Sequence, residues 1–174
     1  VMKTALALTR ERERGTMETL LATPVEPLEV MIGKLAPYVG IGLIQTAIIL
    51  GLARLLFGVP FEGGWGALTI GVTLFIVGSL SLGFLFSTLA KSQLQAMQMS
   101  VFYILPSLLL SGFMFPFRGM PQWAQWLGTI IPVTHFLRVV RGALLKGVGI
   151  VEMWPSLVAL LIFVLAVTAL AMSR

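Results

Sequence analysis

The sequence of 174 residues is 57% hydrophobic and only 11% charged, and its mean hydropathy is +0.98. Because a soluble domain carries about 25% charged residues, these values exclude an ordinary soluble domain and indicate an integral membrane protein. The lack of Cys excludes a disulfide framework, a thiol nucleophile and a cysteine-based metal site. The net charge of +5 suits loops beside an anionic membrane, and the scattered basic residues do not form a nucleic-acid groove.

The chain begins with a short apolar segment, residues 1–9, that passes directly into charged residues. No signal-peptide cleavage pattern follows this segment. We therefore expect residues 1–9 to be the tail of a preceding transmembrane helix, and the chain to be a fragment of a longer protein.

The next segment, RERERGTMETLLATP at residues 10–24, is the most polar part of the chain. Gly15 ends its run of alternating charges, and Thr16 can cap a short helix over residues 17–22 by accepting from backbone N–H groups. Glu18 falls in the first turn, where a negative charge suits the helix dipole. This pattern suits either a juxtamembrane helix that anchors the next span or a docking element for a soluble partner.

Two helix starts overlap after this segment, and Pro27 favours the later one. A proline as the fourth residue of a helix that begins at Thr23 would leave a capping carbonyl unpaired. We therefore expect a helix that begins at Pro27 and runs through Lys34 into the first span.

Four apolar stretches are predicted to be full transmembrane helices, since a helix needs about 20 residues to cross the hydrocarbon core. They are residues 35–57, 67–89, 96–115 and 155–172. Pro106 predicts a kink in the third stretch, and Pro155 suits the first turn of the fourth.

Residues 116–147, between the third and fourth spans, are too polar for a simple span. Pro132 divides them, and Trp123 and Trp126 in the first half are typical of an interfacial aromatic belt. The second half is amphipathic, with Phe136, Val140 and Ala143 on one face and Arg138 and Arg141 towards another. We expect a pair of interfacial or re-entrant helices over about residues 119–146.

The distribution of Lys and Arg gives the orientation, with one conflict. With residues 10–34 on the cytoplasmic side, Lys34, Lys91 and Arg174 all fall where the positive-inside rule places them. The count of spans puts residues 116–147 outside, although they carry Arg118, Arg138, Arg141 and Lys146. We keep four spans, because the alternatives need either a span with three internal cations or a missing span.

The stretch ERERGTMETLLATPVEPLEVMIGKLAPY resembles the cytoplasmic signature of ABC-2 type transporter permeases, the membrane subunits of bacterial ABC exporters, in the multidrug or general efflux branch. Further matching pieces follow in order: LFGVPFEGG, AKSQLQAMQMS, LLSGFMFPFRGMPQWAQW and IIPVTHFLRVVRGALLKG. The resemblance implies that the chain is the C-terminal portion of such a permease, with domains at 1–9, 10–34 and 35–174. It also places residues 116–147 among extracytoplasmic re-entrant helices, in agreement with the count of spans.

The resemblance further implies that the segment at residues 10–34 contains a coupling helix that docks in a separate ATP-binding subunit. The docking residues implied are Glu11, Arg14, Gly15, Thr16, Glu18, Leu20, Leu21 and Pro24, and those of the helix start are Glu29, Gly33 and Lys34. The implied assembly is a dimer of permease subunits, homomeric or with a related chain, in the bacterial cytoplasmic membrane. Its ATP and magnesium belong to the ATP-binding subunit, since this chain has no G-x-x-x-x-G-K-[ST] loop and therefore no nucleotide site of its own.

The function implied is that of a permease subunit which exports an unidentified substrate by coupling to that ATPase. The alternative is a non-transporting scaffold or regulatory subunit that docks an ATPase with the same helix. A membrane-embedded enzyme acting on lipids is disfavoured, because it needs clustered ionisable residues inside the spans and only Arg54, near one end, is present.

The remaining polar residues give weaker signals, and we expect no catalytic, cofactor or metal site. His135 is the only histidine and lacks the partners that catalysis or a metal would need, so we expect a hydrogen-bonded residue at a helix start. Gln45 either faces the transport path or, as we favour, bonds a neighbouring helix. Pro106, Ser111 and Gly112 are candidate gating residues that would let the third span bend, and a static kink is the alternative.

Overall fold

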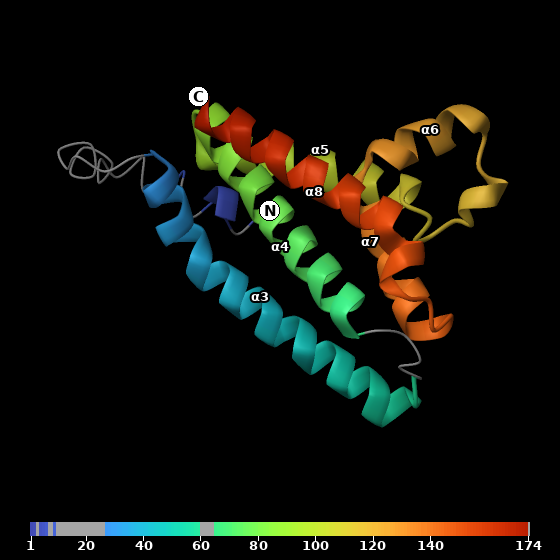
Figure 1. Ribbon diagram of the computed structural model, residues 1–174. Helices are drawn as coiled ribbons and strands as arrows, with labels where there is room; N and C mark the ends of the chain where they lie inside the picture. The colour runs from blue at the N-terminus through green and yellow to red at the C-terminus, as the bar shows by residue number, and fades with distance from the viewer. Residues whose placement is uncertain (3, 7–8, 10–26, 60–64, 174) are drawn as a thin grey trace.

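The computed structural model describes residues 1–2, 4–6, 9, 27–59 and 65–173. These residues are almost all helical and include no β-strand, which confirms the all-α prediction. The helices are α3 (Pro27–Phe57), α4 (Trp65–Leu89), α5 (Gln93–Leu110), the 3-10 helix η1 (Phe117–Gly119), α6 (Gln122–Ile130), α7 (Pro132–Leu145) and α8 (Ile150–Met172) (Figure 1).

Three of the described helices are long and apolar enough to cross a membrane: Ile32–Phe57 within α3, α4 and α8. Helices α6 and α7 meet at a bend of 85°, and the number rises to four if this bent pair is one broken span. The multi-pass helical membrane protein expected from composition is thus confirmed. The bend falls at Ile131, directly before Pro132, where the sequence predicted a division.

The predicted third span, residues 96–115, has the wrong bounds. Helix α5 begins at Gln93, where the Ser92 hydroxyl accepts from the backbone N–H of Gln95, and it ends at Leu110. Gly112 has a φ of +82°, a left-handed conformation that commonly follows the last residues of a helix. Although it has 18 residues, α5 is not among the described helices that are apolar enough to cross a membrane.

The predicted start of the fourth span is also wrong. Helix α8 begins at Ile150 after an extended Gly149, so Pro155 lies inside the helix rather than in its first turn. Glu152 in the first turn suits the dipole of this earlier start. Helix α3 is described from Pro27, and the residues before it lie outside the described ranges, so the predicted helix start at Pro27 stays a prediction.

Helix α4 is the centre of the bundle, and α8 lies along it while α7 covers its first half (Figure 1). The core between α4, α7 and α8 consists of Ala67, Leu68, Val72, Val139, Ala143, Met153 and Leu157. The rings of Phe75 and Phe136 stack beside it with centroids 4.1 Å apart. Phe136 and Val140 pack against this core and Ala143 is part of it, which confirms the amphipathic pattern predicted for this stretch.

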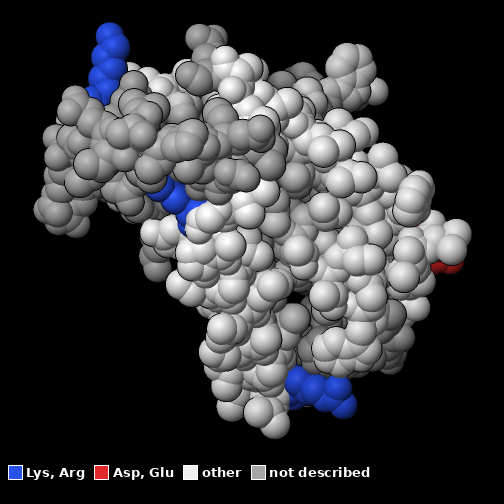
Figure 2. Space-filling model, turned by 60° about the vertical axis from the view of Figure 1, so that its left-hand side comes forward, with Lys and Arg blue, Asp and Glu red and all other residues white. Residues whose placement is uncertain are grey.

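A second core lies at the other end of the bundle, where the start of α3 meets the last turns of α4 and α8. It consists of Leu35, Leu82, Leu85, Val167 and Ala171. The described surface in Figure 2 is almost entirely uncharged, as a surface in contact with lipid requires.

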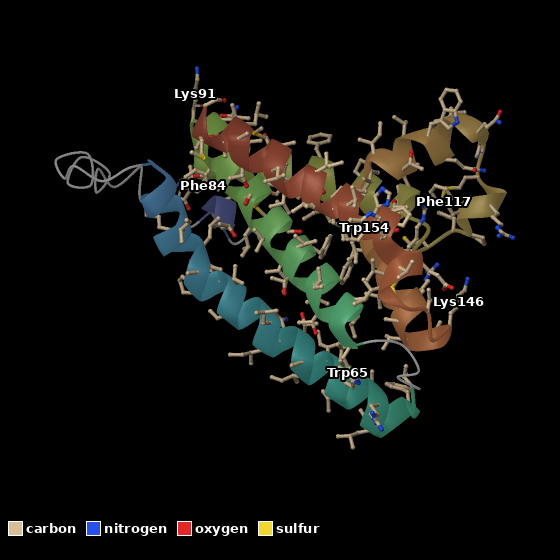
Figure 3. All side chains as sticks on the ribbon, in the orientation of Figure 1. Trp65, Phe84, Lys91, Phe117, Lys146 and Trp154 are labelled. Carbon is tan, nitrogen blue, oxygen red and sulfur yellow. The ribbon has the colours of Figure 1, made fainter. Side chains whose placement is uncertain are left out.

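The ends of the helices alternate between the two ends of the bundle. Figure 1 shows the start of α3, the turn between α4 and α5 and the C-terminus at one end, and the end of α3 with the start of α4 at the other. Lys91 lies at the first end, and Trp65 and Lys146 lie towards the second (Figure 3). This alternation is the one that successive passes through a membrane require.

Candidate functional site

The predicted docking segment lies outside the described residues, so its helix and its contacts stay predictions. This applies to Glu11, Arg14, Gly15, Thr16, Glu18, Leu20, Leu21 and Pro24. The residues that flank the segment on both sides are described, and their contacts show where the chain enters and leaves it.

The chain enters the docking segment from residues that pack closely against the end of α4. Ala5 and Thr9 are buried, and the Thr9 and Ser87 hydroxyl oxygens lie 3.2 Å apart. At Gly83 a Cβ would lie 2.5 Å from the backbone oxygen of Val1, so only glycine allows this approach. The residues before the segment are therefore attached to the last two turns of α4.

The chain leaves the docking segment into α3, which contacts the same part of α4. Leu35 is 6% exposed and packs in the core formed with Leu82 and Leu85. Lys34, one residue earlier, is half-buried, and a Cβ at Gly33 would meet no atom within 4 Å. Glu29 falls in the first part of α3, where the backbone alone is described. Both flanks of the docking segment thus lie against one stretch of α4, residues 82–87.

Farther along, α3 and α4 border an open groove of about 290 Å³. Its lining is mainly apolar, with Thr46 and Thr69 as polar groups and Arg54 and Trp65 where α3 ends and α4 begins. Gln45 is exposed, is not part of this lining, and makes no hydrogen bond to any residue in the described ranges. The favoured interpretation, in which Gln45 bonds a neighbouring helix, therefore finds no support among these residues.

The three predicted gating residues lie at the end of α5 and in the turn that follows. Pro106 is exposed within α5, while Ser111 and Gly112 are buried. The Ser111 hydroxyl donates to the Leu108 carbonyl at 3.1 Å and closes the last turn. Because Gly112 has a positive φ, this turn has a geometry that residues with a side chain rarely adopt.

Helix α7 contacts this turn through side chains that were not predicted to be site residues. The Arg141 guanidinium donates from Nη2 to the Gly112 carbonyl at 3.1 Å. The Arg138 guanidinium lies 5.2 Å from the centroid of the Phe117 ring. At Gly128 on α6, a Cβ would lie 2.5 Å from the Leu110 carbonyl oxygen. Arg141 and Gly112 are 29 residues apart, so local patterns gave no signal of this contact.

His135 has the structural role that the sequence predicted. It lies in the first turn of α7 and donates from Nε2 to the Thr129 carbonyl at 2.8 Å. Next to it, the Thr134 hydroxyl donates to the Gly128 carbonyl at 2.5 Å. These two bonds join the start of α7 to the end of α6. No group of three or more His, Cys, Asp or Glu side chains suited to a metal ion occurs within the described ranges.

Comparison with known proteins agrees with this architecture. Residues 1–173 match the family model described as ABC-2 family transporter protein. The chain is 32% identical over 159 residues to "Probable multidrug ABC transporter permease YbhR" of Escherichia coli (strain K12), covering 91% of this chain and 43% of that protein. It is 34% identical over 166 residues to "Inner membrane transport permease YhhJ" of the same strain, with 92% and 43% covered.

A more distant relative comes from a eukaryote. The chain is 30% identical over 177 residues to "ABC transporter G family member 20" of Dictyostelium discoideum, covering 98% of this chain and 24% of that protein. No solved structure matches the chain. The chain spans less than half the length of these curated relatives. Given the family match over residues 1–173 and the apolar helices, the chain is a multi-pass membrane protein that belongs to the ABC-2 family of transporter proteins.

Proposed function

We propose that this chain is part of the permease subunit of an ATP-driven exporter in the bacterial cytoplasmic membrane. The permease works as a dimer and couples to a separate ATP-binding subunit, which supplies the nucleotide site and its magnesium. Support comes from the family and from relatives whose names describe permeases.

The observation that carries the coupling mechanism is that both flanks of residues 10–26 contact residues 82–87 of α4. Thr9 lies beside Ser87, and Leu35 packs with Leu82 and Leu85. An ATP-binding subunit that moves residues 10–26 would therefore displace α4 through both sets of contacts. Because α4 is packed along α8 and α7, its displacement would shift the whole core rather than one loop.

The decisive residue in our proposal is Glu18, at the start of the predicted docking helix. Glu18→Lys reverses its charge and places a cation at a helix N-terminus, which the helix dipole disfavours. In the full-length permease we expect at least about tenfold less co-purified ATPase, with normal insertion in the membrane. That ratio corresponds to about 1.4 kcal/mol of lost binding.

Glu62→Lys is the matched control, because the sequence places Glu62 in the connection at the opposite end of the first span. This variant should retain the ATPase at the wild-type ratio. If the Glu18 variant retains it equally, the docking role of Glu18 is wrong. ATP-dependent substrate movement in proteoliposomes tests the exporter itself, and assembly with ATPase stimulation but no flux would favour the scaffold alternative.

A further inference from the structure

Four basic residues lie between residues 116 and 147. The predicted count of four spans places this stretch outside the cytoplasm, whereas the positive-inside rule places it in the cytoplasm. Arg118, Arg138, Arg141 and Lys146 are all exposed, and they come from η1, from α7 and from the residue that ends α7. Glu152 is the only acidic residue in the sequence from 65 to 173. Phe117 and Lys146 lie on the same side of the bundle, far from Lys91 (Figure 3). This part of the molecule is thus strongly basic.

The three arginines gather around one turn, residues 112–119. Arg141 donates to the Gly112 carbonyl, and Arg138 lies over the ring of Phe117. Gly112 and Phe117 are themselves close, because a Cβ at Gly112 would lie 3.3 Å from the Phe117 Cβ. Arg118 follows Phe117 directly. The contacts of Arg138 and Arg141 fix their side chains in place while leaving both residues exposed to a ligand.

An apolar cavity of about 430 Å³, shallow and open to the surroundings, lies at the same turn, between the end of α5 and α6. Its lining includes Leu109, Phe115, Met120 and Trp123, as well as Gly119 next to Arg118. On the outer surface of α6, Trp126 and Ile130 are 73% and 77% exposed. Exposed Trp is typical of the depth at which lipid headgroups meet the acyl chains.

We propose that this basic turn binds the phosphate group of a phospholipid, with part of an acyl chain in the apolar cavity between α5 and α6. Arginine suits this ligand, because its planar guanidinium can donate two parallel hydrogen bonds to phosphate oxygens. The cavity favours a lipid over a free anion, since inorganic phosphate has no apolar part to fill it. The arginines are then phosphate ligands, which removes their conflict with the orientation of the chain.

The experiment places a fluorescent reporter beside the proposed site in the full-length permease. Met114→Cys suits the label, because Met114 is 61% exposed in the same turn and is not part of the cavity lining. These 174 residues contain no Cys, and any Cys elsewhere in the full-length permease is replaced by Ser. The labelled protein is reconstituted in vesicles of phosphatidylcholine that contain brominated phosphatidylglycerol or, separately, brominated phosphatidylcholine. We expect stronger quenching by the anionic lipid at equal mole fraction.

Arg118→Gln and Arg138→Gln should each lower the apparent affinity for phosphatidylglycerol by roughly 5-fold. Arg138→Lys keeps the charge and should retain more of this affinity. Lys91→Gln is the matched control, because Lys91 is exposed at the opposite end of the bundle. Arg141 stays unchanged, since its loss would also remove the bond to Gly112.

Two results would overturn the proposal. The first is equal quenching by the two brominated lipids, or quenching that neither arginine variant changes. The second is displacement of the anionic lipid by millimolar inorganic phosphate at constant ionic strength, which would identify a site for free anions. Circular dichroism of each variant shows whether its helices have formed. If a Gln variant is misfolded, the affinity of Arg138→Lys for phosphatidylglycerol decides whether the proposal holds.

Discussion

The apolar parts of α3 and α4 that can cross a membrane have nearly the same length and hydropathy, yet they pack in opposite ways. These parts comprise 26 and 25 residues with mean hydropathies of 1.9 and 2.1, but within an apolar stretch of 18 residues in each, none is buried on α3 and half are buried on α4. Both helices carry glycines. On α4, a Cβ at Gly71 or Gly78 would lie under 3 Å from a side chain of α7 or α8, whereas on α3 a Cβ at Gly40 or Gly51 meets nothing.

This difference shows that apolar composition inserts a helix in the membrane but does not decide which helix forms the core. Lipid tails are as apolar as leucine, so burial in a membrane protein comes from close packing and not from hydropathy. Small residues at contacts allow that packing along α4. Along α3, the exposed face is available to lipid or to another chain.

The largest expected effect on stability comes from truncating a buried side chain in the core. Leu160 on α8 is fully buried, whereas Leu55 on α3 is 82% exposed. Leu160→Ala should destabilise the protein by about 2–5 kcal/mol, because it leaves a cavity among packed side chains. Leu55→Ala should change stability by less than about 0.5 kcal/mol. Thermal unfolding of the full-length permease in detergent measures both, and equal shifts would contradict the contrast between α3 and α8.

The second-largest effect on stability comes from adding a side chain at a glycine where two helices are in close contact. At Gly71 a Cβ would lie 2.7 Å from Val139 Cγ1, and at Gly40 it meets no atom within 4 Å. Gly71→Leu should separate α4 from α7 and cost about 1–3 kcal/mol. Gly40→Leu should be neutral or slightly stabilising, because leucine is a better helix former than glycine. The same unfolding assay checks the pair, and a tolerated Gly71→Leu would mean that α4 and α7 are not in close contact.

The sequence predicted the helices well where chemistry and length were strong signals. All four apolar stretches contain helices, and Pro132 marks the bend between α6 and α7. The errors lie at helix ends that depend on backbone conformation. Gly112 with its positive φ ends α5 early, and Gly149 lets α8 begin before Pro155. Glycines directly after or before an apolar run were the available signals.

The candidate site was less predictable, because its contacts join residues far apart in the chain. The docking residues came from a resemblance and stay predictions outside the described ranges. Thr9 meets Ser87 across 78 residues, and Arg141 meets Gly112 across 29. Periodicity describes one helix at a time, so it gave the apolar face of α7 but not the turn that Arg141 holds.

The smallest effect tests whether the contrast between core and surface also applies to hydrogen bonds. Thr134 is 2% exposed, and its hydroxyl donates to the Gly128 carbonyl of α6 at 2.5 Å, whereas the exposed Thr69 hydroxyl donates to Trp65 within its own helix. Thr134→Val replaces the hydroxyl with a methyl group of similar size and should cost about 0.5–1 kcal/mol. The cost stays small because the Ile131 N–H also donates to Gly128. Thr69→Val should be silent in the same unfolding assay, and a larger loss there than at Thr134 would mean that α6 and α7 are not joined by this bond.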